Sequence, residues 1–395
     1  MRLRPFLLVF GLFVLAACNP SASVGSPTTT TRPSTTTTIP ALQVEVQEAP
    51  QGLREVITAF YAWTMKPAGP PPRSLPQGLV RHLRDLPGAE QLRVDGQASV
   101  ASILPKGQVG VVTAGKDVVL AVEEGGGWRV VGAKLGRFGK RAWYGPSPRM
   151  ILAIGSDARP GQDPPSSRSD SLHILTSVLP SGRGAIVGIP RDSWVEAPSG
   201  GSTKITNIMA AGGPEATLQT VGSLSGLPLE GYLLTGFAGF VDLVNDFGGI
   251  DVEIPFAMSD PSSGASFNPG EQYLHGWNAL AFARNRHLPG GDFTRSLHQG
   301  IIIEAVLDKA RSQGIAHLPA HLATLTTHAT TNLGPEALLT LAAGAYELKP
   351  EAVENVVVPG SVGTVGSASV VFIGDGADQV FADLADGVLE SQPEP

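Results

Sequence analysis

The sequence predicts an α/β domain that follows a smaller α+β domain, and three observations lead to this prediction. Residues 150–154 form a continuous apolar run, which is typical of a strand buried on both faces. Further strand signals follow at residues 172–178 and 185–189, and apolar residues then recur at helical spacing. Ahead of this region, residues 49–146 combine helical patterns with four consecutive strand signals.

The composition excludes several classes of protein. The 395 residues include 28 Lys and Arg against 35 Asp and Glu, which gives a net charge of −7. This balance argues against a nucleic-acid-binding protein, because such proteins need a basic surface to displace phosphate counterions. The single cysteine excludes an internal disulfide framework, a zinc site built from several cysteines and a CxxC redox site.

The N-terminus has the pattern of a secretion signal. Two arginines precede an apolar run that is short for a bilayer span, and the run ends at Leu15-Ala16-Ala17-Cys18. This tetrapeptide resembles a bacterial lipobox, which implies cleavage after residue 17 and lipidation of the Cys18 sulfur. An uncleaved anchor and an ordinary secretory signal are the alternatives. We therefore expect an extracytoplasmic protein that is anchored to the bacterial cell membrane as a lipoprotein.

The chain divides by composition into five segments. Residues 1–17 form the signal peptide, and residues 18–48, rich in Thr, Pro and Ser, form a solvated tether. Residues 49–146 form the small domain, in which two helices and a strand meander resemble a cystatin-like or NTF2-like fold. Residues 147–390 form the large domain, and residues 391–395 form a tail.

Arginine and aspartate residues follow or precede the strands of the large domain. The three pairs are Asp157 with Arg159, Arg168 with Asp170, and Arg191 with Asp192. Ligands collect at strand ends in open α/β sheets, so we expect these pairs to face one site. A second group follows a helical stretch that begins near Leu274, and it consists of Arg284, Arg286, Asp292, Arg295 and Gln299.

These residue types suit a pyrophosphate ligand. A guanidinium group stays charged near neutral pH, and its planar fork binds phosphate oxygens bidentately. Converging arginines repel one another without an anion between them, and nearby carboxylates disfavour that anion unless a divalent cation bridges them. Hard oxygen ligands favour Mg²⁺ or Mn²⁺. The whole set predicts a metal-assisted pyrophosphate site, whereas any single pair is better explained as a surface salt bridge.

Six motifs in order along the chain resemble the LytR–CpsA–Psr family. They are GSDAR at 155–159, RSD at 168–170, IPRD at 189–192, Lys204 and Asn207 ahead of two glycines, FGGIDVEIP at 247–255, and RNR with GDFTRSLHQ at 284–299. Members of this family transfer anionic glycopolymers from an undecaprenyl-pyrophosphate carrier to peptidoglycan outside the membrane. The resemblance implies a three-layer α-β-α domain with a mixed sheet, a divalent cation, an arginine-lined pyrophosphate pocket and an apolar groove for the lipid.

The resemblance also implies roles for individual residues. Asp157 and Asp170 match the aspartates that hold the Mg²⁺ or Mn²⁺ ion. The residues that match pyrophosphate contacts are Arg159, Arg168, Arg191, Arg284, Arg286, Arg295 and Gln299. The catalytic candidates are Arg191, Asp192 and Asp292, and the general base stays open between Asp157 and Asp292. His298 stands where the family commonly has arginine; a histidine can still donate to phosphate, but its charge titrates near neutrality.

The sequence therefore predicts a phosphotransferase that moves an anionic glycopolymer from a polyprenyl-pyrophosphate carrier to peptidoglycan. Two alternatives stay open, namely a non-catalytic cell-wall-binding lipoprotein and a polyprenyl-pyrophosphate pyrophosphatase. Apolar residues at helical spacing, such as Phe237, Phe240 and Leu243, are individually better explained as core than as a lipid groove. The resemblance implies that part of these faces leaves room for a polyprenyl chain.

Overall fold

The computed structural model describes residues 41–105 and 107–389, and these residues belong to one compact unit. The predicted signal peptide, Cys18, the tether up to residue 40 and the tail at 391–395 lie outside the described residues. Among the helices that are described, none combines the length and apolarity needed to cross a membrane.

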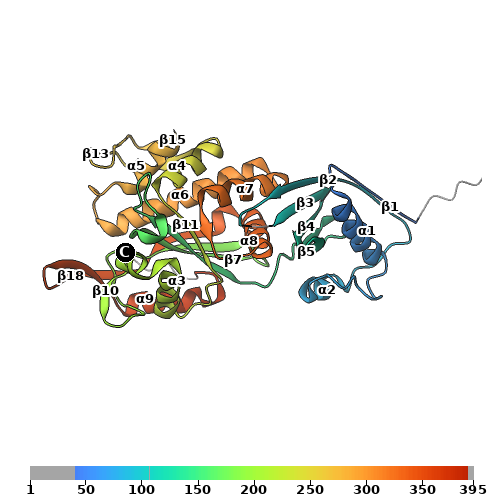
Figure 1. The fold of residues 1–395 in the computed structure, drawn as a ribbon, viewed down its shortest axis with the longest axis horizontal. Helices are drawn as coiled ribbons and strands as arrows, with labels where there is room; N and C mark the ends of the chain where they lie inside the picture. The colour runs from blue at the N-terminus through green and yellow to red at the C-terminus, as the bar shows by residue number, and fades with distance from the viewer. Residues whose placement is uncertain (1–40, 106, 390–395) are drawn as a thin grey trace, which may run out of the picture. The chain divides into compact units, whose positions relative to one another are not determined.

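The first part of the described chain is a five-stranded sheet with two helices on one face (Figure 1). The strand order follows the sequence, with β1 parallel to β2 and the other neighbours antiparallel. The elements are β1 (Leu42–Gln47), α1 (Gln51–Met65), α2 (Gln77–Leu83), β2 (Leu92–Ser102), β3 (Gln108–Ala114), β4 (Asp117–Glu124) and β5 (Gly127–Leu135). The predicted helices and strand meander are thus present.

Strand β1 corrects the predicted extent of the tether. Leu42, Val44 and Val46 alternate with polar residues, and a period of two is the pattern of a strand with one buried face. The strand pairs with β2, with Leu42 opposite Leu92, and the Val46 side chain is buried in the core beneath α1. Residues 42–47 therefore belong to the small domain rather than to the tether.

The second part is built around a six-stranded mixed sheet. Its strands are β6 (Arg149–Ser156), β7 (Ser169–Val178), β8 (Arg183–Gly188), β11 (Tyr232–Thr235), β16 (Thr330–Thr331) and β17 (Val353–Val357). The spatial order is β16-β11-β6-β7-β8-β17. Strand β7 runs antiparallel to both β6 and β8, while β11 and β17 run parallel to β6 and β8 respectively. The predicted mixed sheet is confirmed.

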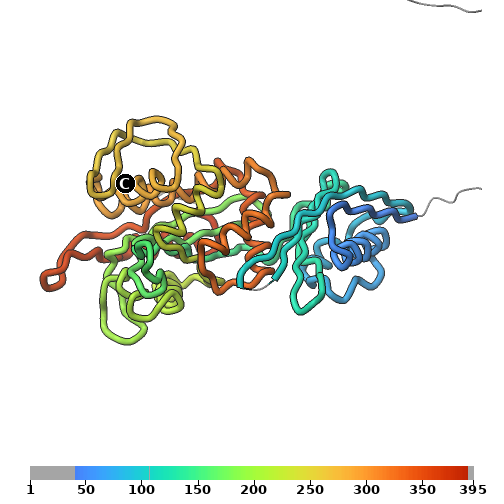
Figure 2. Tube along the Cα trace, turned by 45° about the horizontal axis from the view of Figure 1, so that its top comes forward, coloured from blue at the N-terminus to red at the C-terminus, as the bar shows by residue number. Residues whose placement is uncertain are grey.

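Helices cover both faces of this sheet, which confirms the predicted three layers (Figures 1 and 2). One layer holds α3 (Thr206–Ser225) and α9 (Asp375–Asp383). The other holds α4 (Phe237–Asp246), α5 (Gly276–Arg284), α6 (Asp292–Gln313), α7 (Leu318–His328) and α8 (Pro335–Glu347). Met150 and Leu152 of β6 pack towards α3 and α9, whereas Ile151 packs towards α7 and α8, so the apolar run is covered on both faces.

Four two-stranded ribbons complete the large domain. They are β9 (Trp194–Glu196) with β10 (Ser202–Lys204), β12 (Ile250–Ile254) with β15 (Gly270–Leu274), β13 (Met258–Asp260) with β14 (Ala265–Phe267), and β18 (Gly360–Val365) with β19 (Ala368–Ile373). The ribbons β12–β15 and β13–β14 share an apolar core with α5 and α6. This core supports the segment in which the RNR motif lies.

The sheet of the small domain packs against the large domain. Val109 and Leu120 on β3 and β4 share one apolar core with Leu318 of α7 and Leu339 of α8. An ion pair between Lys134 and Glu347 at 2.8 Å joins β5 to α8. The face of the small sheet that turns away from α1 and α2 is therefore filled by protein, while the boundary at residue 146 stays a prediction.

Candidate functional site

Three of the motif segments meet at one edge of the six-stranded sheet. Strand β6 ends at Ser156, β7 begins at Ser169 and β8 ends at Gly188. Because β7 runs antiparallel to both neighbours, these three ends lie side by side. Asp157 and Arg168 extend the pairing: the Asp157 amide donates to the Arg168 carbonyl at 2.9 Å, and the Arg168 amide donates to Asp157 Oδ1 at 3.0 Å.

Two aspartates hold arginines from distant parts of the chain. Arg191, just after β8, donates from Nη1 to Asp170 Oδ1 at 2.5 Å, and Arg286 Nη2 lies 3.7 Å from Asp170 Oδ2. Arg191 Nε lies 3.9 Å from Asp292 Oδ1, and Arg295 forms an ion pair with the same carboxylate. Charges from the strand ends, the α5–α6 connection and the start of α6 therefore converge.

A polar pocket with a volume of about 400 Å³ opens over these strand ends. Its lining residues are Asp157, Arg168, Arg191, Asp192, Lys204, Thr206, Asn207 and Arg286. Lys204 Nζ donates to Asp192 Oδ1 at 3.1 Å. Thr206 is buried, and its hydroxyl finds no hydrogen-bond partner in the described part of the chain. A pocket with three arginines, one lysine and a spare hydroxyl suits an anion that carries oxygen acceptors.

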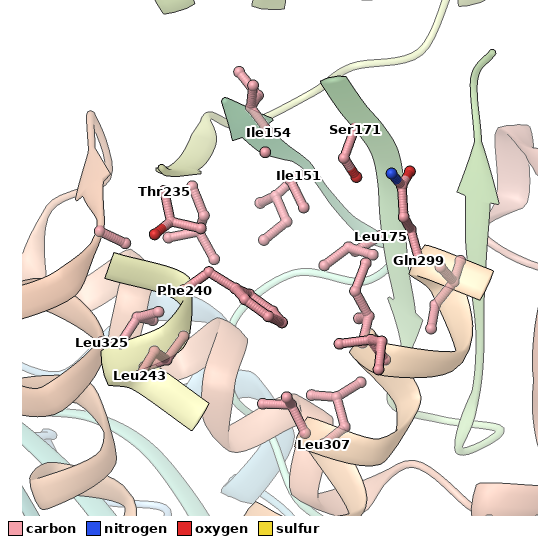
Figure 3. Close-up of a pocket in the computed structure, with 18 of the residues that line it drawn as sticks. Ile151, Ile154, Ser171, Leu175, Thr235, Phe240, Leu243, Gln299, Leu307 and Leu325 are labelled. Atoms are coloured by element: carbon pink, nitrogen blue, oxygen red, sulfur yellow. The ribbon is translucent and has the colours of Figure 1, made fainter. Parts of the chain in front are cut away.

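An apolar cavity of about 370 Å³ begins next to the polar pocket, and Arg286 lines both. Its polar mouth consists of Asp170, Arg284, Arg286, Arg295 and Gln299. Beyond the mouth it lies between the sheet and the layer of α4, α6, α7 and α8, with Leu175, Phe240 and Leu307 around it (Figure 3).

One face of α6 follows the cavity along its length. The lining residues on this helix are Arg295, Gln299, Ile302, Ile303, Val306, Leu307, Ala310 and Arg311, which is the spacing of one helix face. Gln299 and Arg311 are separated by roughly 18 Å at 1.5 Å per residue. The cavity therefore runs along much of α6, and its walls are mainly aliphatic.

Polar groups return where α6 ends. His321 and Tyr346 line this part of the cavity together with Arg311. The His321 ring nitrogens lie 2.5 Å from the Tyr346 hydroxyl and 2.6 Å from Gln313 Oε1. Burial, with a smaller contribution from His317, lowers the pKa of His321 to about 4, so this ring is neutral at neutral pH.

Arg284 lies at the mouth of the apolar cavity. Its guanidinium lies 4.4 Å from the centre of the Phe237 ring, a cation–π contact at the entrance of the cavity. Burial lowers the pKa of Arg284, and repulsion from Arg286 and Arg159 acts in the same direction, while Asp170 opposes it. A bound anion would relieve this repulsion.

Comparison with known proteins decides which family this fold and site belong to. Residues 143–383, more than half of the chain, match the model of the LytR_cpsA_psr family. The chain belongs to the LytR–CpsA–Psr family. The resemblance carried by the six motifs is thereby confirmed.

The relatives of this LytR–CpsA–Psr protein include named transferases. It is 35% identical over 172 residues to the polyisoprenyl-teichoic acid–peptidoglycan teichoic acid transferase TagV of Bacillus subtilis (strain 168), covering 41% of this chain and 43% of TagV. It is 36% identical over 167 residues to TagU of Bacillus mycoides (strain KBAB4), a protein of the same description, covering 42% of this chain and 53% of TagU. The chain spans about half the length of these curated relatives.

Solved structures agree with the fold. The crystal structure of B. subtilis TagV superposes with a TM-score of 0.54 at 28% identity, covering 62% of this chain and 98% of that one. A structure of TagT bound to LI-WTA superposes with a TM-score of 0.51 at 23% identity, covering 61% and 90%. The second likeness supports the fold alone.

The predicted site residues of the LytR–CpsA–Psr domain gather at this strand edge, with two qualifications. Arg159 lines neither space, although it lies close enough to Arg284 to lower the pKa of that group. Gln299 lies at the mouth, where its amide donates to the carbonyls of Asp170 at 3.4 Å and Ala283 at 3.3 Å, which ties α6 to β7 and α5. The roles of these residues stay predictions.

His298 corrects an expectation. Its ring is 1% exposed, stacks on Phe282 at 4.6 Å and lines neither the pocket nor the cavity. Burial lowers its pKa to about 4, so the ring does not titrate near neutrality. The physical reason is helical geometry: Arg295 and Gln299 share the face of α6 that meets the mouth, and position 298 falls on the neighbouring face.

The carboxylates fit a divalent cation that takes further ligands from its substrate. Within residues 41–105 and 107–389, no group of three or more His, Cys, Asp or Glu side chains is arranged to hold a metal. Asp157 and Asp170 supply hard oxygens, and Asp170 already pairs with Arg191. Mg²⁺ commonly binds one or two carboxylates and completes its shell with water and phosphate oxygens. This donor set therefore suits Mg²⁺ or Mn²⁺ only together with a phosphate ligand.

Sequence reasoning missed two features of the site. Asp260, at the end of β13, is buried and accepts a hydrogen bond from the Arg286 amide at 3.1 Å. No motif marks this aspartate. The second feature is the extension of the cavity to α7 and α8, whose lining residues have the pattern of ordinary core.

Proposed function

We propose that this protein transfers an anionic glycopolymer from a polyprenyl-pyrophosphate carrier to peptidoglycan. The observation that carries the proposal is the junction of an arginine-lined pocket with an apolar cavity at Arg286. A lipid pyrophosphate is an amphiphile that needs both environments side by side. The descriptions of TagV and TagU as polyisoprenyl-teichoic acid–peptidoglycan teichoic acid transferases support this class of reaction.

The arginines divide between the two phosphates of the donor. Arg284, Arg286 and Arg295 at the mouth of the cavity bind the phosphate next to the lipid. Arg168 and Arg191 in the polar pocket bind the phosphate on the polymer side. These fixed charges stabilise the negative charge that develops as the bond between the phosphates breaks.

The reaction is a phosphoryl transfer with a balanced set of bonds. A hydroxyl oxygen of a peptidoglycan sugar forms a bond to the polymer-side phosphorus, and the bond from that phosphorus to the bridging oxygen breaks. The bridging oxygen leaves with the lipid as a polyprenyl monophosphate. The hydroxyl proton passes to a carboxylate, for which Asp157 lines the pocket and Asp292 is engaged by two arginines.

A divalent cation is part of the proposal. Asp157 and Asp170 would hold Mg²⁺ or Mn²⁺, which would neutralise charge on the phosphate oxygens. The remaining rate acceleration comes from the arginines, which position the phosphates and compensate their charge.

An assay with three arms tests the function against its alternatives. The donor is a glycan linked to a polyprenyl pyrophosphate, offered with peptidoglycan oligomers, without them, and with them plus a chelator. A transferase yields glycan-bearing peptidoglycan and polyprenyl monophosphate, and chelation reduces both. A pyrophosphatase releases glycan phosphate without an acceptor. A cell-wall-binding protein retains the donor without turnover, which would contradict the proposal.

Membrane anchoring through Cys18 is a separate proposal that rests on the lipobox pattern. Cells expressing the full chain are labelled with a clickable fatty acid, and the protein is isolated from the membrane fraction. Label on the wild type and none on a Cys18→Ala variant is expected. Equal labelling of both would contradict lipidation at this residue.

A further inference from the structure

A buried carboxylate holds the loop that carries the RNR motif. Asp260 lies at the end of β13, in the ribbon that precedes α5, and its side chain is 0% exposed. A buried charge without partners costs several kcal/mol, so the groups around such a carboxylate reveal what retains it.

Both oxygens of Asp260 accept hydrogen bonds. Oδ2 accepts from the Arg286 amide at 3.1 Å, and Oδ1 accepts from the amide and hydroxyl of Ser262 at 2.9 and 2.6 Å. His287 Nδ1 lies 2.9 Å from Oδ1. Burial acts to raise the pKa of Asp260, but these hydrogen bonds outweigh it and hold the pKa well below its ordinary value. The group is therefore a permanent negative charge, bound on one side to its own turn and on the other to the RNR loop.

Asp260 also acts on the charge of the cluster. It and Asp170 are the two carboxylates that raise the pKa of Arg284 against burial and the repulsion of Arg286 and Arg159. Asp170 lines the mouth and pairs with Arg191, whereas Asp260 lines neither the pocket nor the cavity. Its charge therefore stays in place whatever is bound.

We infer that Asp260 is a positioning residue that fixes the backbone of Arg286, so that the Arg286 guanidinium meets the lipid-side phosphate. This inference rests on the proposed function. A role confined to the β13–β14 turn, through the two contacts to Ser262, is the competing explanation. The two explanations differ in what they predict for ligands with and without a pyrophosphate.

The test compares two ligands on the folded protein. Geranyl pyrophosphate occupies the mouth and the cavity, and geraniol, its uncharged counterpart, occupies only the cavity. Asp260→Asn keeps a carbonyl oxygen for Ser262, removes the charge and gives the Arg286 amide a poorer partner. The matched control is Asp251→Asn, which removes an exposed aspartate from the neighbouring strand β12. Calorimetry gives the dissociation constants, and thermal unfolding confirms that each variant is folded.

We expect Asp260→Asn to weaken geranyl pyrophosphate binding by about tenfold, because the Arg286 amide loses its hydrogen bond to a charged acceptor and the loop no longer holds Arg286 at the mouth. Geraniol binding should be unchanged, and Asp251→Asn should affect neither ligand. If Asp260→Asn does not fold, His287→Ala serves instead, since its ring is 69% exposed and its loss leaves the buried carboxylate in place. Because His287 also contacts the Asp260 carboxylate, His287→Ala should weaken geranyl pyrophosphate binding by roughly threefold and leave geraniol binding unchanged.

Two other results have distinct meanings. If the wild type prefers geranyl pyrophosphate and the variant keeps this preference, or loses affinity for both ligands equally, the positioning role is wrong while the proposed function stands. If the wild type shows no preference for the pyrophosphate, the proposed function fails, and the inference fails with it.

Discussion

The polar pocket and the apolar cavity meet at Arg286, yet each is a cost to the folded state for a different reason. In the pocket, Arg191 and Arg286 gather around Asp170 with their charges partly removed from water. In the cavity, a space of about 370 Å³ interrupts an interior that would otherwise be close-packed. Neither feature is explained by packing, whereas the proposed lipid-pyrophosphate donor would fill both.

The largest expected effect comes from a change in the polar pocket. Arg191→Ala removes a guanidinium that touches Asp170 and lines the pocket, so transfer should slow by about a thousandfold, the range seen when one charge-stabilising donor is lost. Initial rates with the glycan-linked donor measure this. Arg93→Ala, an exposed arginine of β2 paired with Asp95, is the control and should keep its rate. A rate within threefold of wild type for Arg191→Ala would remove this arginine from the reaction.

The polar pocket and the apolar cavity also differ in how far they can be predicted from the sequence. The polar residues are recognisable because Asp157 comes three residues after the end of one apolar run and Arg191 comes shortly after another, so the sequence marks where these strands end. The pairing of β6, β7 and β8 that sets these ends side by side is not recognisable, because it depends on contacts between strands.

The apolar cavity is implied by the family resemblance, but the residue pattern alone does not reveal it, for a physical reason. Phe240 and Leu243 have the spacing of a core-facing helix whether a neighbour or an empty space lies opposite. The difference is a matter of a few ångströms between layers, which no local pattern encodes. His298 shows the same limit, since its position in a motif suggested the pocket while the turn of α6 places it in the core.

A second variant distinguishes the apolar cavity from the polar pocket by filling the cavity. Ile303→Trp places a large ring in the cavity from α6, so binding of geranyl pyrophosphate should weaken by roughly tenfold or more as buried apolar contact is lost. Inorganic pyrophosphate should bind as before, because the arginines are untouched. Val362→Trp, at a position 71% exposed, is the control. Equal losses for both ligands would show that the two spaces are not independent.

A third variant tests whether residue 298 faces the polar pocket. His298→Arg restores the residue type that the family commonly has there, but the structure places the new charge beside Phe282 and Phe256. The free energy of unfolding should fall by about 3 kcal/mol, as expected for an unpaired buried charge, and pyrophosphate affinity should not rise. Urea unfolding measures the first quantity. A stable variant with tighter pyrophosphate binding would return this position to the pocket.

The smallest effect, a change of at most about 1.4 kcal/mol over one pH unit, tests the same assignment through pH. Burial lowers the pKa of His298 in the folded protein to about 4, against about 6.5 when unfolded, so the unfolded chain binds more protons between these values. Stability should therefore fall as the pH drops from 6.5 to 4, by up to about 1.4 kcal/mol per pH unit for each such histidine. His173, whose pKa burial also lowers to about 4, adds a contribution of the same sign.

His298→Phe removes one of these contributions while keeping a ring against Phe282, so its stability should depend less steeply on pH in this window. No partner for His298 Nδ1 occurs among the residues that the structure describes, so the phenyl ring sacrifices no hydrogen bond at that atom. His275→Gln, which changes an exposed ring, is the control. Identical slopes for wild type and His298→Phe would mean that the folded protein protonates this ring as readily as the unfolded chain does. That result would place His298 in a solvated environment, such as the polar pocket, rather than in the apolar core.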